Sequence, residues 1–308
     1  QKDRFNRDLG SYKQGAYDTI PVAGADLTLT LDKELQEYGE RLMRGKRGGI
    51  VAIEPKTGEI LSIISGPTYN PNLLVGRDRS KNYNELYYDS IAKPTWDRSL
   101  LAQPSPGSPF KILNALAALQ EGVITPENYV VCQNGFFVGK HKRGCHCGGG
   151  VRDLRLGVAK SCNAYFADTY RKIFSKYRKP GDGIDAWEKH IKSFGLGEFL
   201  GYDLPSGQPG RVPNRAYYDK VYGTDRWAPS FIISNAIGQG EVAATPIQLA
   251  NMTAAIANKG YYFTPHVVKA INGIPVKDPQ FTQRKNTTIE AKHFGPVIQA
   301  MADVYSPE

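Results

Sequence analysis

Residues 104–119 constrain the fold most, because they define where a loop must turn into a helix. Residues 104–111 read PSPGSPFK, and the largely apolar run ILNALAAL follows at once. Pro109 suits the first helical position, since its missing N–H would have no partner there. A helix that begins here places Ser108 and Lys111 three residues apart on the same face.

This serine and lysine pair has a chemical interpretation and a purely structural one. An amine one helical turn from a hydroxyl can accept its proton, which is how lysine activates serine without histidine. Alternatively, Ser108 caps the helix and Lys111 is a solvated residue of the first turn. A second S-x-x-K match, Ser90 to Lys93, is followed by Pro94, which disfavours helical geometry at the lysine.

The second informative segment is Ser161-Cys162-Asn163, within GVAKSCNAYFADTYRKIF. Its alternation of polar and apolar residues predicts a short loop that opens an amphipathic helix. Ser161 and Asn163 can then face one cleft while Cys162 turns inward, although simple helix capping would need the same residue types. A similar triplet, 80–82, lies in a polar stretch with no helix predicted after it, and we discount it.

These segments together resemble the class B penicillin-binding-protein transpeptidases, the serine acyl-transferases that cross-link peptidoglycan. PGSPFK and SCN are similar to the first two motifs of that family, and RGGIVAIEPKTGEILSIIS to its first two strands. KSFGLGEFLGYDLPSGQPGRVPN and SNAIGQGEVAATPIQLANMTAAIANKG follow in the family's order. NPNLL and LLAQPSPGSPFKILNAL are most similar to the elongation-type group, the penicillin-binding proteins 2.

The resemblance implies a fold, an activity and a role for each motif residue. The fold is the α+β penicillin-binding-protein and serine β-lactamase fold, an antiparallel sheet covered by helices, which the predicted order of strands and helices also favours. Ser108 would attack the penultimate D-Ala carbonyl of a stem peptide after Lys111 accepts its proton. Ser161 would relay a proton to the leaving amine, and Asn163 would bind the donor peptide.

The implied function is a D,D-transpeptidase of cell elongation that β-lactams acylate. Its implied partners are stem peptides, a membrane-bound glycosyltransferase and the elongation machinery, at the periplasmic face of the inner membrane. Three related functions stay open. A serine β-lactamase needs a group that activates water, and no E-x-x-L-N segment is present. A β-lactam-sensing receptor domain would be acylated once, and a D,D-carboxypeptidase would transfer the acyl group to water.

The family's third motif, Lys-Thr-Gly, is expected on a strand well after S-x-N. The one match, Lys56-Thr57-Gly58, lies between the apolar runs 50–53 and 60–64 and predicts a hairpin turn instead. We therefore expect a transpeptidase domain over 46–308 that ends before this strand, after a helix over 296–304. Residues 1–45 would be an arm from a pedestal domain plus the first helix. Losing one oxyanion donor costs on the order of 100- to 1,000-fold in rate, so we expect this chain alone to be weakly active or inactive.

The four cysteines raise a second question. Three of them lie in CQNGFFVGKHKRGCHC. Cys132, Cys145 and Cys147, with His141 or His146 as the fourth ligand, would form a closed site for structural zinc. A disulfide plus a free thiol, or three unligated thiols, are the alternatives. The resemblance supports the metal, because some elongation-type relatives have a metal site in this region. Cys162 is expected to pack rather than to bind metal.

Composition excludes some functions and the remaining pattern predicts further elements. The net charge is +9, but the basic residues are scattered and no nucleic-acid motif accompanies them, so we expect no nucleic-acid partner. No apolar run reaches the roughly 18 residues of a membrane span. We predict helices over 32–43, 187–194 and 245–259, strands over 27–31 and 261–271, and an irregular segment over 70–97.

Overall fold

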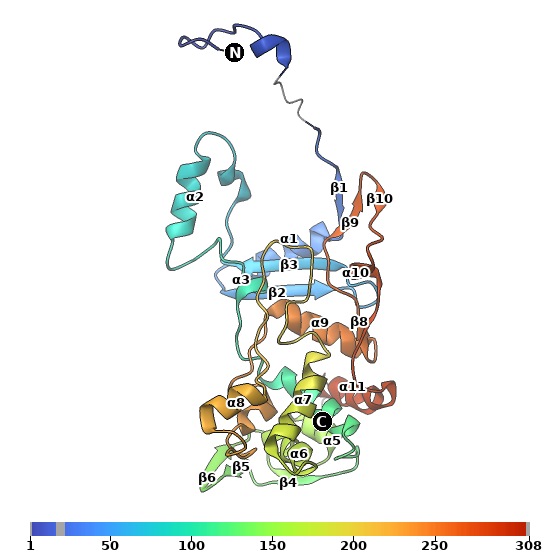
Figure 1. Ribbon diagram of the computed structural model, residues 1–308. Coiled ribbons are helices and arrows are strands. Elements are labelled where there is room, and N and C mark those ends of the chain that lie inside the picture. The colour runs from blue at the N-terminus through green and yellow to red at the C-terminus, as the bar shows by residue number, and fades with distance from the viewer. Residues whose placement is uncertain (1, 17–21, 306–308) are drawn as a thin grey trace.

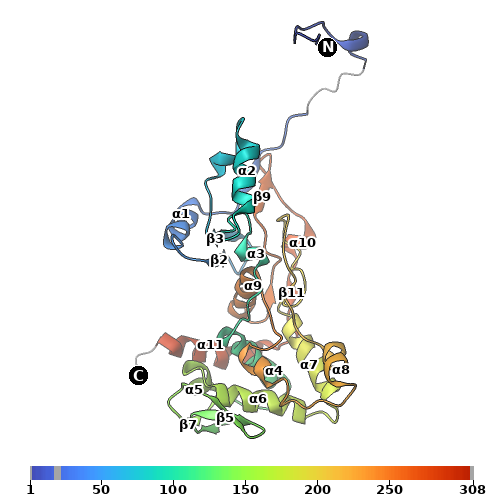
Figure 2. The ribbon, with the colours of Figure 1, turned by 90° about the vertical axis from the view of Figure 1, so that its left-hand side faces the viewer.

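The computed structural model describes residues 2–16 and 22–305. Part of the predicted arm, namely residue 1 and residues 17–21, lies outside the described residues. The body is elongated, with the strands β1, β2, β3 and β9 towards one end and the helices α4 to α8 at the other (Figures 1 and 2). The N-terminal segment extends away from the end that carries the strands (Figure 2).

A two-stranded antiparallel sheet forms the centre of the upper half. β2 (Gly48–Ile53) pairs with β3 (Ile60–Gly66), with Ile50 opposite Ile64. The Lys-Thr-Gly triplet forms the turn between them, as predicted, and Gly58 has a φ of +81° that suits glycine. The helix α1 (Lys33–Leu42) packs on one side of this sheet and α9 (Pro246–Ala257) on the other (Figure 1). This confirms the predicted arrangement of an antiparallel sheet covered by helices.

The remaining strands of the upper half are short. β1 (Leu27–Leu29) pairs with β9 (Val268–Ile271), which also pairs with β10 (Ile274–Pro275). β8 (Tyr261–Tyr262) pairs with β11 (Lys285–Asn286). The single strand predicted over 261–271 is therefore wrong. The chain leaves β8 before Pro265 and runs along the β2–β3 turn, where the His266 N–H donates to the Gly58 carbonyl.

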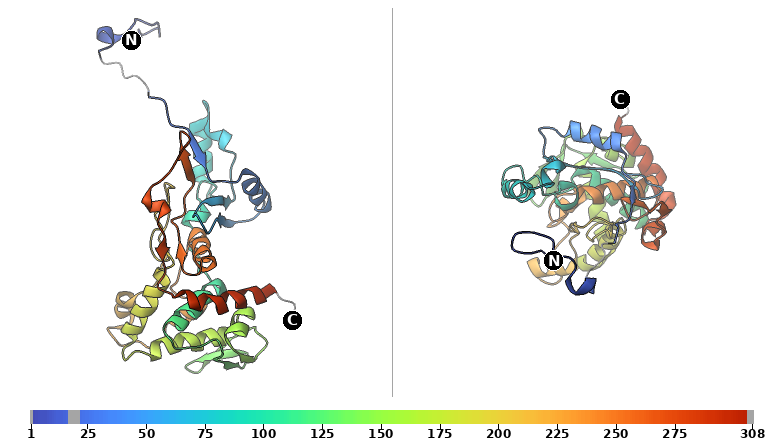
Figure 3. Two further views of the ribbon diagram at one scale, coloured as in Figure 1. Left: turned by 90° about the vertical axis from the view of Figure 1, so that its right-hand side faces the viewer. Right: turned by 90° about the horizontal axis from the view of Figure 1, so that it is seen from above.

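Apolar helices build the core of the lower half. α4 (Lys111–Gln120) is buried along all of its length except the last residue. α6 (Asn163–Ser175), α7 (Pro180–Lys192) and α11 (Phe294–Ala302) pack around it. Figure 3 shows α11 lying across the top of this group. The smaller elements are α5 (Leu154–Ala159), α8 (Arg215–Tyr222), β4 (Val130–Cys132), β5 (Gly135–Val138), β6 (His141–Gly144) and β7 (Gly150–Arg152).

Residues 70–97 are more ordered than the sequence predicted. A helix, α2 (Arg79–Tyr88), occupies the middle of this segment, and a short helix, α3 (Arg98–Leu101), follows it. No residue of α2 is buried, so the helix has no apolar stripe that a sequence pattern could reveal. The discounted triplet 80–82 lies inside α2.

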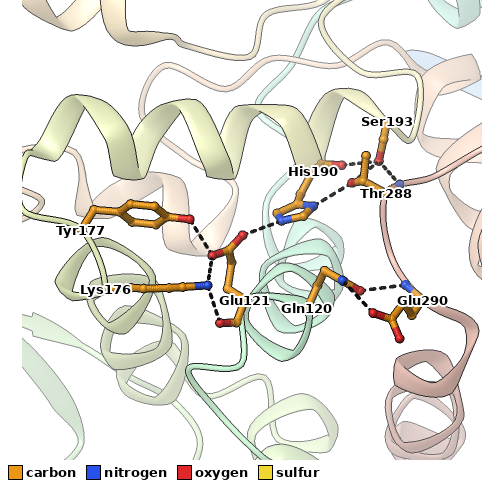
Figure 4. A network of polar contacts seen from close by, with 8 residues as sticks. All are labelled: Gln120, Glu121, Lys176, Tyr177, His190, Ser193, Thr288 and Glu290. Carbon is orange, nitrogen blue, oxygen red and sulfur yellow. Dashed lines mark hydrogen bonds and ion pairs between the residues drawn. The ribbon is translucent and has the colours of Figure 1, made fainter.

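A network of polar side chains joins the ends of the lower helices (Figure 4). The Glu121 carboxylate accepts hydrogen bonds from Lys176 Nζ and the Tyr177 hydroxyl, both at 2.6 Å, and lies 2.9 Å from His190 Nε2. His190 Nδ1 lies 2.7 Å from Thr288 Oγ1. Burial raises the pKa of Glu121, but the hydrogen bonds outweigh it and lower the pKa to about 2.

We expect Glu121→Gln to lower the free energy of unfolding near pH 7 by about 1–3 kcal/mol, because the amide cannot replace the charge-assisted bonds. The folded pKa lies below the unfolded value, so this stabilisation is present above pH 4.5 and is lost as the pH falls towards about 2. Urea unfolding of both proteins at pH 7 and pH 3, with the exposed Glu127→Gln as control, measures it. A difference between variant and wild type that stays constant down to pH 3 would contradict the assignment.

Candidate functional site

Ser108 lies on a short turn that leads into α4. The 3-10 turn η3 (Ser108–Phe110) follows Gly107, whose φ of +65° is a conformation that glycine adopts without strain. Phe110 is fully buried and anchors the turn, whereas Ser108 is exposed. The Ser108 hydroxyl is therefore held in position and accessible to a ligand.

Lys111, one turn below, is buried and meets the S-x-N segment. It is 2% exposed. Its Nζ donates hydrogen bonds to the Ser161 carbonyl at 2.8 Å, Ser161 Oγ at 2.9 Å and Asn163 Oδ1 at 2.7 Å. Burial lowers the pKa of the Lys111 amine to about 8. The structure thus brings together the four residues that the sequence singled out.

Ser161 connects the nucleophile to the amine. Its Oγ lies 3.1 Å from Ser108 Oγ and 2.9 Å from Lys111 Nζ. Within the described part of the chain, no hydrogen bond joins Ser108 directly to Lys111, and the Ser161 hydroxyl bridges the two side chains instead. Ser161 has a φ of +50°, a strained conformation for a residue with a side chain, and such strain is common at functional sites.

Two residues that the sequence analysis missed hold the nucleophile turn in place. Gly238 accepts a hydrogen bond from the Gly107 N–H at 2.8 Å, and a Cβ on Gly238 would lie 2.2 Å from the Gly107 carbonyl oxygen. Asn114, fully buried in α4, donates to the carbonyls of Asn235 at 3.1 Å and Ala236 at 2.9 Å. The sequence signal that could have identified Asn114 is that it is a polar residue inside the apolar run 112–119.

A cleft of about 450 Å³ opens beside Asn163. Its walls carry Phe136 and Phe231 together with the polar residues Arg143, His146 and Gln239. Asn163 Nδ2 donates to the Gly144 carbonyl at 3.1 Å, which fixes the side-chain amide at the mouth of the cleft. A cleft whose walls combine aromatic rings with fixed polar groups is typical of a ligand site.

The four cysteines converge in the layer beneath this cleft. Cys132, Cys145, Cys147 and Cys162 are all buried, and their Sγ atoms lie within 4.8 Å of one another. The shortest separations are 3.4 Å for 147–162, 3.5 Å for 132–147 and 3.7 Å for 145–162. Zinc–sulfur bonds of about 2.3 Å in a tetrahedron place sulfurs about 3.8 Å apart. The four thiols therefore fit a structural zinc ion.

The residue grouped with the three predicted cysteines differs from the expected one. Cys162, rather than His141 or His146, has its ligand atom within 4.8 Å of theirs. His141 lies on β6, whose residues are all exposed. His146 stands between the buried Cys145 and Cys147, so it points the opposite way and lines the cleft. The four cysteines, all within the described residues, are free thiols, so the alternative of a disulfide among them is not seen.

The cysteine cluster contacts the Ser161-Cys162-Asn163 segment directly. The Asn163 N–H donates to Cys145 Sγ at 3.1 Å. Cys162 is the residue between Ser161 and Asn163, and its Sγ accepts from the Tyr165 N–H at the start of α6. Any group that fixes the sulfurs therefore also fixes the turn that positions Asn163.

Comparison with known proteins agrees with this geometry. The model of the penicillin binding protein transpeptidase domain matches residues 48–308. This chain belongs to the penicillin-binding protein transpeptidase family. The peptidoglycan D,D-transpeptidase MrdA of Acinetobacter baumannii is 34% identical over 258 residues, which cover 82% of this chain and 37% of that protein. The chain thus spans well under half the length of this curated relative.

Solved structures of the family have the same fold. Pseudomonas aeruginosa PBP2 in complex with WCK 5153 is 35% identical, with a TM-score of 0.80 over 91% of this chain and 62% of that one. Helicobacter pylori PBP2 in complex with MreC is 28% identical, with a TM-score of 0.75 over 92% of this chain and 50% of that one. These matches confirm the predicted family and fold. Among the residues described for this transpeptidase domain, no helix is long and apolar enough to span a membrane.

Proposed function

We propose that this transpeptidase domain catalyses peptidoglycan cross-linking during cell elongation, with Ser108 as the nucleophile. The supporting observation is the continuous path from Ser108 Oγ through Ser161 Oγ to the buried Lys111 Nζ. A hydroxyl linked in this way to an amine of lowered pKa is the arrangement that nucleophilic acyl transfer requires.

The reaction has two halves. Neutral Lys111 takes up the Ser108 proton by way of the Ser161 hydroxyl, and Ser108 Oγ attacks the penultimate D-Ala carbonyl of a donor stem peptide. The peptide bond breaks, an ester to Ser108 forms, and the proton returns through Ser161 to the leaving D-Ala amine. An amine of a neighbouring stem peptide then attacks the ester and gives up a proton to Lys111. As the ester bond breaks, Lys111 passes this proton through Ser161 to Ser108 Oγ, which restores the Ser108 hydroxyl and the neutral amine. Asn163 holds the donor peptide at the mouth of the cleft.

Covalent labelling tests this function. A fluorescent penicillin should add one adduct mass to Ser108, detected by intact and peptide mass spectrometry, and Ser108→Ala should abolish the label. The experiment uses this chain and a chain extended past Glu308, because the first lacks a second Lys-Thr-Gly. A long-lived adduct supports the transpeptidase, rapid turnover indicates a β-lactamase, and labelling away from Ser108 in both chains would overturn the assignment.

The pKa of Lys111 predicts a pH dependence. Only the neutral amine accepts a proton, and burial lowers its pKa to about 8. The second-order rate constant for acylation should therefore rise about tenfold per pH unit below pH 8 and level off above it. Stopped-flow acylation between pH 6 and 9.5, corrected for spontaneous hydrolysis of the β-lactam, measures this. A rate constant independent of pH over that interval would exclude Lys111 as the base.

The cofactor, partner and location assignments are also proposals. We propose that Cys132, Cys145, Cys147 and Cys162 hold a structural zinc ion, which their mutual distances support. The complex of the related Helicobacter pylori PBP2 with MreC supports a partner in the elongation machinery. By the same relationship, we propose that the protein acts at the periplasmic face of the inner membrane.

A further inference from the structure

A second cavity has a lining that shares no residue with the cleft beside Asn163. Its volume is about 700 Å³, and it opens between α2, the loop that follows α2, and α3. Figure 1 shows α2 and α3 at the end that carries the β2–β3 sheet, whereas α6 lies at the other end. The lining residues used below are Arg47, Tyr87, Tyr88, Lys93, Trp96 and Arg98. None of them contacts the cleft beside Asn163.

Arg98 is a buried cation in the wall of this cavity. The residue is only 4% exposed. Its guanidinium donates to the carbonyls of Ala92 at 2.8 Å, Lys93 at 3.2 Å and Trp96 at 3.3 Å. Within the described part of the chain, no carboxylate forms an ion pair with it. The three carbonyl oxygens hold the guanidinium but carry no full negative charge, so the charge of Arg98 favours an anion in the cavity.

Arg47 adds a second cation beside the first. Its guanidinium donates to the Ile91 carbonyl, next to the Ala92 carbonyl that Arg98 holds. Burial and, after it, the charge of Arg47 lower the pKa of Arg98, as expected for like charges close together. The one acidic residue of the cavity, Asp89, accepts hydrogen bonds from the N–H groups of Ile91 and Ala92 instead. The lining thus has three cationic side chains, Arg47, Lys93 and Arg98, against one carboxylate, and a net positive charge remains.

The other walls are aromatic and open to solvent. Trp96, Tyr87 and Tyr88 are 41%, 57% and 76% exposed. The Arg98 guanidinium lies 5.3 Å from the centroid of the Trp96 ring, which keeps the ring beside the charge. Large exposed rings next to convergent cations are typical of a site for a ligand that has both a carboxylate and an apolar face.

We propose that this cavity binds a carboxylate-bearing glycopeptide segment of the cell wall, outside the catalytic cleft. The exposed Arg47 binds the carboxylate, the buried Arg98 adds its positive charge from behind, and the aromatic rings pack against the sugar or peptide. The identity of the ligand rests on the proposed function, whereas the anion site rests on the cavity alone. Such a site would hold a polymer strand while its stem peptide reacts elsewhere.

Tryptophan fluorescence provides a direct measurement of binding. The chain has three tryptophans, and Trp187 and Trp227 are 0% and 3% exposed, so the exposed Trp96 reports on the cavity. A disaccharide-tripeptide muropeptide has free carboxylates but no D-Ala-D-Ala bond, so it is no substrate for acylation. Its addition should change the Trp96 emission in a saturable way. Arg47→Gln should weaken binding about 10-fold or more, since a charged hydrogen-bonded pair is lost.

Controls separate the possible outcomes. Arg79→Gln removes an exposed arginine of α2 that does not line the cavity, and it should leave binding unchanged. A muropeptide with amidated carboxylates should bind to the wild-type protein as weakly as the unmodified muropeptide binds to Arg47→Gln. If inorganic phosphate competes fully and the sugar adds no affinity, the site is a simple anion site and the glycopeptide proposal fails. Equal binding by all variants would also overturn it.

Acylation of Ser108 by fluorescent penicillin is measured in parallel on the same proteins. Arg47→Gln should leave that labelling unchanged, because Arg47 has no contact with the catalytic residues. Normal labelling without muropeptide binding would reject this inference and keep the proposed function. Muropeptide binding that depends on Arg47, without labelling of Ser108, would support this inference and reject the proposed function.

Discussion

Lys111→Met should slow acylation of Ser108 by about 10²–10⁴-fold while the domain stays folded. Methionine has almost the same length as lysine and suits a buried position beside the Phe166 ring, which lies 5.7 Å from Nζ. It cannot accept the proton that Ser108 must lose. The Ser108 hydroxyl then remains hydrogen-bonded to Ser161 but has no base at the end of the path.

Lys111→Arg tests whether Lys111 acts as a proton acceptor or only through its positive charge. Arginine keeps a cation near Ser161 and Asn163 but does not deprotonate in proteins, so acylation should fall about as far as in Lys111→Met. Lys189→Met, at an exposed lysine of α7, is the matched control and should acylate normally. Thermal unfolding of all three variants checks the fold. Substantial acylation by Lys111→Arg would mean that Lys111 acts through its charge, and the proposed proton path would then be wrong.

The sequence predicted where Ser108 and Lys111 lie because their positions depend on local rules. A proline and glycine before an apolar run define a helix start, and that start determines how Ser108 and Lys111 lie. The hairpin nature of Lys56-Thr57-Gly58 followed from the same kind of turn chemistry, and the structure confirms it. These features involve neighbours in the chain, so they need no knowledge of tertiary packing.

The errors concern contacts between distant segments. The bridge through Ser161 depends on a left-handed φ and on how α6 approaches α4, and neither is encoded in a short spacing. The proximity of Cys162 to the other three cysteines was not predicted, because Cys162 lies 15 residues beyond Cys147 and seemed to belong only to the S-x-N turn. The helix α2 was missed because it buries no residue.

Cys162→Ser should abolish zinc binding and lower the free energy of unfolding by several kcal/mol. Structural zinc contributes about 10–16 kcal/mol of binding energy in small zinc domains, and a larger core retains part of its stability without it. Serine still accepts a hydrogen bond as a helix cap, so the start of α6 keeps its partner and the loss reports on the metal. Elemental analysis of protein purified without chelator, together with urea unfolding, measures both effects.

His141→Ala is the matched control, because the sequence favoured His141 as a ligand and the structure places it on an exposed strand. It should bind one zinc ion per chain and unfold like the wild type. If His141→Ala loses the metal and Cys162→Ser keeps it, the structural assignment is wrong, and a wild type without zinc rejects the site altogether. Removal of zinc by a chelator should also slow acylation of Ser108, because the Asn163 N–H donates a hydrogen bond to Cys145 Sγ. The metal would then act on catalysis only by holding Asn163 in place, so re-addition of zinc should restore the rate.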